Sequence, residues 1–381
     1  MKVAFYLTNN RNMRDGVTHY ATEIMNRLPE CEDVEYVGEA FLTYKDSRKA
    51  VVDYFHNLTP ALPVHTVRTP LPMRWLHKFC SYKIPVSYET LMGSTADVRV
   101  FFHNLLPYCK MKGKKIVVIH DLTPLHDPVV PAKKKKKLEA DCRNTVKIAD
   151  IIFTDSEYSR QDIVNCFPEA EEKICVNYCG IDFDRFSTPV SETEREAIRA
   201  KYALPQQYLL FIGQARTNKN LPNLLRGYAL LSAEVRKMYP LVLANHTKEL
   251  AKLADELQIA SDVRFLSGID EEDMVGVYQG ARALALISTS EGFGLPLIEA
   301  MAAGVPTIAS DATCLPEICG NASKFVKADD IQSIAEGLNA ALTDTTLRES
   351  LTARGLERAK CFNWDTTAEK FYNEIQFLLR R

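Results

Sequence analysis

Short, continuous apolar runs recur along the chain and alternate with segments in which apolar residues repeat every three or four positions. Unbroken runs of this length are typical of strands buried on both faces of a parallel sheet, and the longer period indicates amphipathic helices. The first half predicts a helix that opens at the Asp15-Gly16 turn and covers Thr18–Leu28. Its predicted strands are Val3–Leu7, Val98–Phe102, Ile116–Ile119 and Ile151–Thr154.

The same alternation begins again after a polar stretch, so we expect a linker near Phe183–Val190. Beyond it the pattern predicts a helix over Leu221–Leu231. The predicted strands are Tyr208–Ile212, Leu241–Ala244, Val263–Leu266, Ala283–Ile287 and Thr307–Ala309. These elements predict an α/β protein of two Rossmann-like, doubly wound domains that face a central cleft, where ligands usually bind.

Length and composition agree with this interpretation. The chain has 381 residues, enough for two or three domains, and its 46% apolar and 25% charged content excludes a mainly disordered or coiled-coil protein. No apolar run approaches the ~18 residues of a membrane-spanning helix, and the N-terminus lacks a signal-peptide pattern. The 10 cysteines show no CxxC spacing, so we expect reduced thiols in the cytoplasm and no structural zinc.

The net charge of −2 hides an uneven distribution, because residues 68–147 hold 16 basic and 6 acidic side chains. Within that stretch Lys133–Lys137 stands at an expected helix start, where positive charge opposes the helix dipole. Two interpretations stay open: a solvated helix face, or contact with an anionic membrane surface, to which each lysine contributes about 1 kcal/mol. Nucleic acid is not expected, since no aromatic residues are interleaved with the lysines.

The most informative segment is Ser290–Pro306, which predicts a glycine loop followed by a helix. Gly292 and Gly294 let the backbone approach a ligand closely, and the free N–H groups at the start of the helix suit a phosphate. Glu291 and Glu299 would repel a phosphate unless they bind something else, and sugar hydroxyls are suitable partners. An ordinary glycine turn, with two carboxylates that compensate the helix dipole, explains the same residues about equally well.

This segment resembles the signature of the retaining glycosyltransferases of family 4, which have the two-domain GT-B fold. The resemblance implies that Glu291 contacts the donor sugar and that Glu299 holds the ribose of the nucleotide. It also implies that the intervening backbone holds the diphosphate of a nucleotide sugar. The residues of that backbone are Gly292, Phe293, Gly294 and Leu295.

The resemblance extends over nearly the whole chain. Residues 211–220 resemble the loop whose Arg and Lys clamp the donor diphosphate, which implies this role for Lys219 and Arg216. Many members carry the arginine directly after the glycine, where this chain has Gln214, so Arg216 would substitute from two residues further on. Asn245 is a second departure, because the family usually ends that strand in glycine.

Two loops of the first half also match the family. Residues 119–128 resemble its His-Asp loop, which implies that His120, followed by Asp121, reaches the donor sugar and the acceptor, whereas His126 is interpreted as structural. Gly16 resembles part of the glycine-containing loop on the acceptor side and could equally be a simple turn residue. Trp364 matches the motif that anchors the last helix.

The resemblance implies three segments: an acceptor-binding domain over residues 1–185, a donor-binding domain over 186–362, and a helix over 363–381 that returns to the first domain. Asp182-Phe183-Asp184 has the spacing of a metal motif from a different glycosyltransferase fold, but it lies in the expected linker, so no metal site is assigned. The choice of base is expected to depend on the backbone near Ser267–Ile269.

The function implied is transfer of a hexose, with retention, from a GDP- or UDP-linked donor to a glycan or lipid-linked acceptor. Mannose is the favoured sugar, and the expected setting is bacterial surface polysaccharide synthesis at the inner face of the membrane, without metal or cofactor. Two alternatives stay open: a nucleotide-sugar epimerase or hydrolase of the same fold, and a nucleotide-sugar-binding protein with a degenerate site.

Overall fold

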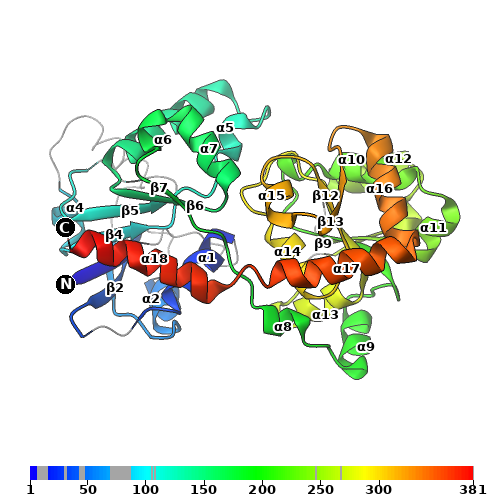
Figure 1. The fold of residues 1–381 in the computed structure, drawn as a ribbon, viewed down its shortest axis with the longest axis horizontal. Helices are drawn as coiled ribbons and strands as arrows, with labels where there is room; N and C mark the ends of the chain where they lie inside the picture. Colours follow the sequence, from blue (N-terminus) through cyan, green and yellow to red (C-terminus); the bar gives the residue numbers. More distant parts are fainter. Residues whose placement is uncertain are drawn as a thin grey trace. The chain divides into compact units, whose positions relative to one another are not determined.

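The computed structural model describes residues 1–6, 16–29, 32–42, 48–68, 87–103, 106, 109–244, 247–266 and 268–380 (Figure 1). The chain forms two compact units. The first unit comprises Met1–Cys179 together with Trp364–Arg381, and the second comprises Gly180–Asn363. The first crossing therefore precedes the linker expected at Phe183–Val190, because Phe183–Ser187 is a short helix, α8, of the second unit.

The first unit is built on a seven-stranded sheet of order β3-β2-β1-β4-β5-β6-β7, in which neighbouring strands pair in parallel. The strands are β1 (Lys2–Tyr6), β2 (Glu35–Leu42), β3 (Val64–Arg68), β4 (Val98–Phe101), β5 (Lys114–Val118), β6 (Ile151–Thr154) and β7 (Ile174–Val176). The helices are α1 (Gly16–Met25), α2 (Arg48–His56), α4 (Tyr88–Met92), α5 (Thr123–His126), α6 (Ala132–Ile148), α7 (Glu157–Cys166) and α18 (Trp364–Leu379), with a 3-10 turn at Pro168–Ala170.

Helices cover both faces of this sheet, with α6 and α7 on one face and α1 and α18 on the other (Figure 1). Alternate strand residues supply the two cores. Tyr6 and Phe101 pack in the cluster that includes Val146 of α6, whereas Phe153 stacks on Phe371 of α18 with ring centroids 4.4 Å apart. Strands buried on both faces explain why the sequence shows continuous apolar runs there.

The second unit has a six-stranded parallel sheet of order β10-β9-β8-β11-β12-β13. Its strands are β8 (Tyr208–Ile212), β9 (Leu241–Ala244), β10 (Val263–Phe265), β11 (Ala281–Leu286), β12 (Thr307–Ser310) and β13 (Ser323–Val326). Its helices after α8 are α9 (Glu192–Lys201), α10 (Leu221–Ala229), α11 (Ala233–Met238), α12 (Lys248–Glu256), α13 (Met274–Gln279), α14 (Leu295–Ala302), α15 (Leu315–Cys319), α16 (Ile331–Thr343) and α17 (Thr345–Ala359). Three 3-10 turns lie at Thr217–Lys219, Ala260–Asp262 and Glu271–Asp273.

The strand order reverses at one point in each sheet, between β1 and β4 in the first unit and between β8 and β11 in the second. Loops that leave such neighbouring strands run to opposite faces and open a crevice at the carboxyl edge of the sheet, where ligands of doubly wound folds bind. The prediction of two doubly wound α/β units is therefore confirmed. No helix in the described part of the chain is long and apolar enough to cross a membrane.

Candidate functional site

The switch point of the second sheet brings together two charged residues that are far apart in sequence. Lys219 ends the 3-10 turn after β8, and Glu291 lies in the loop after β11. The Lys219 Nζ donates to Glu291 Oε1 across 2.6 Å, and their side chains are only 16% and 10% exposed. The family resemblance implied that both residues serve one donor site, and the structure places them in direct contact.

Glu291 is held through both its side chain and its main chain. Ser288 Oγ donates to its Oε1 across 2.5 Å, and the backbone N–H of Glu291 donates to Thr313 Oγ1 across 3.1 Å. The Cys314 thiol lies against the Glu291 carbonyl oxygen, and burial raises the pKa of that thiol well above its ordinary value. Since its main chain and its side chain are both bonded, Glu291 has a fixed orientation.

The two loops of the switch point are bonded to each other. Asn218 Nδ2 donates to the Ser290 carbonyl across 2.8 Å, and the Thr289 N–H donates to the Asn218 carbonyl, also across 2.8 Å. These bonds hold the turn that carries Lys219 against the loop that carries Glu291. The pair is therefore preorganised, as a charged binding site requires.

Gly294 sets the start of α14 next to this pair. Its φ of +97° is a left-handed conformation that L side chains rarely adopt, and a Cβ there would lie 2.8 Å from Leu315 Cδ2. Gly294 occupies the N-cap position, so no cap side chain competes for the Leu295 N–H. Pro296 has no N–H, and the Leu297 N–H donates to the Gly294 carbonyl across 2.9 Å. Phe293 is buried edge-on against Phe362, with centroids 5.4 Å apart, so Phe293 would contribute to a ligand site through its backbone.

Glu299 lies further along α14 and accepts a hydrogen bond from the Tyr278 hydroxyl of α13. Burial, together with the negative charge of Glu299, raises the pKa of Tyr278 well above its ordinary value. The phenol therefore stays protonated and donates, which fixes the Glu299 carboxylate.

Arg216 lies in the same loop as Lys219 but is exposed. Its Nε donates to Gln214 Oε1 across 3.0 Å, so the residue that departs from the family pattern is bonded to the arginine that was expected to compensate for it. The Gln214 side chain thus orients the guanidinium of Arg216, which was expected to take the place of the family's arginine at position 214. Asn245 and Ser267 lie outside the described residues.

In the first unit, His120 follows β5 and is bonded to a carboxylate that the sequence analysis did not identify. His120 Nδ1 lies 2.8 Å from Asp155 Oδ2, with Asp155 directly after β6, and the Tyr20 ring meets the imidazole edge-on at 5.4 Å. Burial alone would lower the pKa of His120, but the charge and hydrogen bond of Asp155 outweigh it and raise the pKa. The imidazole is therefore protonated to a higher pH than an ordinary histidine.

The remaining acceptor-side candidates have local contacts. Asp121 Oδ1 accepts from the Thr123 N–H across 2.8 Å and so helps to start α5, and Gly16 begins α1 with open space where a Cβ would be. The residues missed from sequence are Asp155, Ser288 and Tyr278. A signal existed for Asp155, because it follows a buried strand next in order to the strand that His120 follows, and the carboxyl ends of neighbouring parallel strands share one edge.

The chain is similar to several known proteins. The family model described as "Glycosyl transferases group 1" matches residues 194–358. The chain is 31% identical over 271 residues to O-antigen chain mannosyltransferase B of Escherichia coli, covering 70% of this chain and 71% of that protein. It is 30% identical over 375 residues to the D-inositol 3-phosphate glycosyltransferase of Corynebacterium jeikeium, covering 87% and 88%. It also matches the serotype-specific mannosyltransferase WbdA of Escherichia coli at 29% identity over 69% of this chain, but spans only 33% of that longer protein.

Solved structures with the same fold are more distant in sequence. Sucrose-phosphate synthase from Thermosynechococcus elongatus superposes with a TM-score of 0.77 at 18% identity, covering 100% of this chain and 99% of the other. Anabaena Alr3699/HepE in complex with UDP and glucose gives a TM-score of 0.75 at 16% identity, covering 99% of each chain. The two units thus form the GT-B fold.

Proposed function

Because the chain belongs to the family of group 1 glycosyl transferases, we propose that its second unit binds a nucleotide-diphosphate sugar and that its first unit binds the acceptor. The sugar transferred is a hexose, with mannose the first candidate, and its anomeric configuration is retained. The donor is GDP- or UDP-linked, and the acceptor is a growing surface glycan or a lipid-linked precursor. Two of the similar proteins are mannosyltransferases by name, which supports the choice of mannose.

The observation that carries the proposal is the bonded pair Lys219–Glu291 at the switch point, beside the start of α14. An ammonium group has three donors, and Glu291 uses one of them, so further donors can face phosphate oxygens. The backbone N–H groups of Gly294 and Leu295, where α14 begins, supply a second, neutral source of donors for the same diphosphate. Glu291 and the buried imidazole of His120 are left to orient sugar hydroxyls.

The proposed step breaks the bond between the anomeric carbon and the diphosphate oxygen while the acceptor oxygen bonds to that carbon on the same face. The proton of the acceptor hydroxyl goes to the leaving phosphate oxygen, so no separate base is needed. Lys219, Arg216 and the α14 amides stabilise the charge that develops on the leaving diphosphate. These groups make a metal and a cofactor unnecessary in the proposed reaction.

We place the enzyme in the cytoplasm, at the inner face of the membrane. Lys133–Lys137 occupies the first turns of α6, where these side chains are exposed apart from the half-buried Lys135. Val129, just before the helix, is 66% exposed. An exposed apolar residue next to five cations is the combination that a peripheral contact with anionic lipids uses.

The test is release of nucleoside diphosphate from GDP-mannose, UDP-glucose and related donors, with and without a mannose-terminated oligosaccharide, followed by assignment of the anomeric configuration of the product. We expect transfer from GDP-mannose and an α-linked product, as in the donor. Lys219→Ala and Glu299→Ala should each reduce turnover by about 10²–10³-fold, the usual effect of removing one preorganised donor or binding group. Lys237→Ala and Glu256→Ala, which change exposed charges of the same unit, should not.

Unchanged turnover in both Lys219→Ala and Glu299→Ala would refute the site. Rapid donor consumption without any acceptor would indicate an epimerase or hydrolase instead. If calorimetry detects no binding of GDP, UDP or other nucleoside diphosphates, the site is degenerate and the proposal fails.

A further inference from the structure

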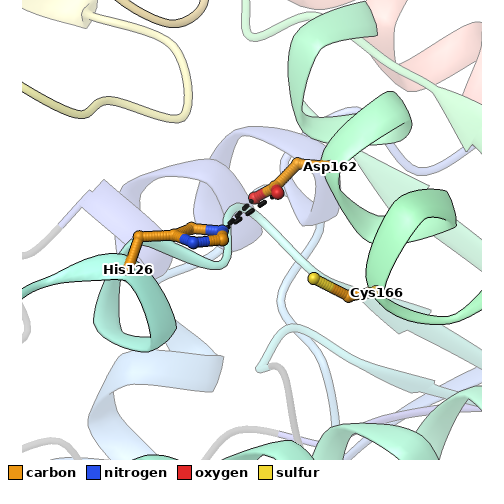
Figure 2. A group of neighbouring side chains, drawn as sticks. All are labelled: His126, Asp162 and Cys166. Atoms are coloured by element: carbon orange, nitrogen blue, oxygen red, sulfur yellow. Dashed lines mark hydrogen bonds and ion pairs between the residues drawn. The ribbon is translucent and has the colours of Figure 1, made fainter.

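A second His-Asp pair lies on the surface of the first unit, and a cysteine thiol lies near it (Figure 2). His126 ends α5, and its Nε2 lies 2.9 and 2.8 Å from the two carboxylate oxygens of Asp162 on α7. Cys166 is one helical turn beyond Asp162, and its side chain points toward the same pair in Figure 2. One ligand atom from each of the three residues lies within 4.8 Å of the other two.

From this arrangement we propose that His126, Asp162 and Cys166 form a zinc-binding site. An imidazole nitrogen, a carboxylate oxygen and a thiolate sulfur are the three donor types that zinc accepts in proteins, and such mixed sets favour it over the oxygen-preferring Mg²⁺ and Ca²⁺. Three protein ligands leave one tetrahedral position for water. This site has no CxxC spacing, because its ligands come from two helices and His126 lies 36 residues before Asp162 in sequence.

Without a bound ion, the contact between His126 and Asp162 contributes little to stability. His126 is 49% exposed, and an exposed ion pair contributes about 0–1 kcal/mol, so the pair alone is a weak connection. Cys166 takes part in neither bond. Cysteine binds zinc as the thiolate, so zinc uptake should release a proton.

The position of the site indicates a structural role for the ion. His126 closes the segment that begins at His120, and Asp162 lies on the helix that follows Asp155. The buried pair His120–Asp155 and the surface pair His126–Asp162 therefore join the same two strand-to-helix connections. A zinc ion at the surface would fix α5 against α7 and so hold the loop that carries His120. This task does not depend on which sugar the enzyme transfers.

The test is titration of the metal-free, reduced full-length protein with Co²⁺, which reports thiolate ligation by a sulfur-to-cobalt charge-transfer band and tetrahedral geometry by its visible absorption. We expect one equivalent to produce both signals and Zn²⁺ to displace it. Cys166→Ser should lose the charge-transfer band, and His126→Gln and Asp162→Asn should lose the tight equivalent. Cys361→Ser, which removes an exposed thiol of the second unit, should leave the signals unchanged.

A band that survives in Cys166→Ser, or no stoichiometric binding by the wild-type protein, would overturn the proposal. Folding of each variant is checked by its thermal midpoint without metal. Zn²⁺ should raise that midpoint for the wild-type protein and for Cys361→Ser but not for the three ligand variants, since an ion bound only to the folded state stabilises it by mass action.

Discussion

At the scale of single residues, the His120–Asp155 pair predicts how stability depends on pH. Because the pKa of His120 is raised above its ordinary value of 6.5 in the folded state, its protonation stabilises the fold below that pH, and this contribution is lost as pH rises through the folded pKa. Burial also raises the pKa of Asp155, so the charge of the pair is lost again in acid. In Asp155→Asn, burial is opposed only by the smaller effects of Asp121 and of the Phe102 backbone, so the pKa of His120 should fall, and each pKa unit corresponds to about 1.4 kcal/mol. Urea denaturation from pH 6 to 9 should show a gap between the two proteins that narrows with rising pH. A gap of constant size would contradict the assignment.

Gly294 gives a second residue-scale prediction. Gly294→Ala forces a side chain into a left-handed conformation and against Leu315, so the second unit should lose about 1–3 kcal/mol of stability, and nucleoside diphosphate affinity should fall with it. Gly304→Ala is the matched control at the other end of α14, because its φ is +72° but its Cβ would meet only Thr352 Cγ2 at 4.0 Å. It should lower stability and leave affinity intact. Calorimetric titration with GDP and UDP separates the two outcomes, and equal affinity losses would count against a ligand site at Gly294.

The residues that contact a ligand in the proposal could be predicted from sequence, whereas those that hold them could not. Glu291 and Lys219 stand in motifs that are local in sequence. Tyr278, which donates to Glu299, stands in no such motif, and its role depends on α13 packing near α14. Support of this kind depends on tertiary packing, so no residue spacing in the sequence indicates it.

At the scale of elements, α6 carries the lysine run and predicts membrane association. Replacing Lys133–Lys137 with Gln should remove about 1 kcal/mol of attraction per lysine and abolish co-sedimentation with phosphatidylserine-containing vesicles at low salt. Vesicles of phosphatidylcholine should not bind the wild-type protein, and higher salt should weaken binding to the anionic ones. Gln at Lys237, Lys252 and Lys360, exposed lysines of the second unit, is the control and should retain binding. Equal binding to neutral vesicles would refute an electrostatic contact.

The strands predicted from apolar runs are present, but β2, β3, β7 and β13 were not predicted. For β2 the reason is a buried charge. Glu39 lies in the middle of this strand with no exposed surface, and Arg99 of β4 donates to its carboxylate across 3.3 Å while Tyr88 donates across 3.2 Å. A glutamate in an apolar run indicates an exposed position until its partner is known. The partner lies 60 residues further along the chain.

At the scale of the whole molecule, the chain passes between the units twice, and its last helix completes the core of the first. In α18, Trp364 packs against Tyr20 of α1 with centroids 5.8 Å apart, and the Tyr372 hydroxyl donates to the Ile24 carbonyl across 3.1 Å. The first unit is therefore complete only after the second has been synthesised. The return of the last helix to the first unit was predicted from the family resemblance alone, because α18 has the ordinary amphipathic pattern of a helix that could pack on either unit.

This arrangement predicts that damage to α18 destabilises the first unit and spares the second. Phe371 has no exposed surface and stacks on Phe153 at 4.4 Å and on Phe102 at 6.0 Å, so Phe371→Ala should cost about 3–5 kcal/mol. Phe377, on the same helix, is 46% exposed, and Phe377→Ala is the matched control with a much smaller expected cost.

Hydrogen exchange of the full-length variants distinguishes the units. Phe371→Ala should accelerate exchange in β1 and β4–β6 and leave β8 and β11–β12 protected, because the first unit opens without the second. Nucleoside diphosphate binding should then persist in a protein whose transfer activity is impaired. Equal acceleration in both sheets would show instead that the two units unfold as one cooperative body.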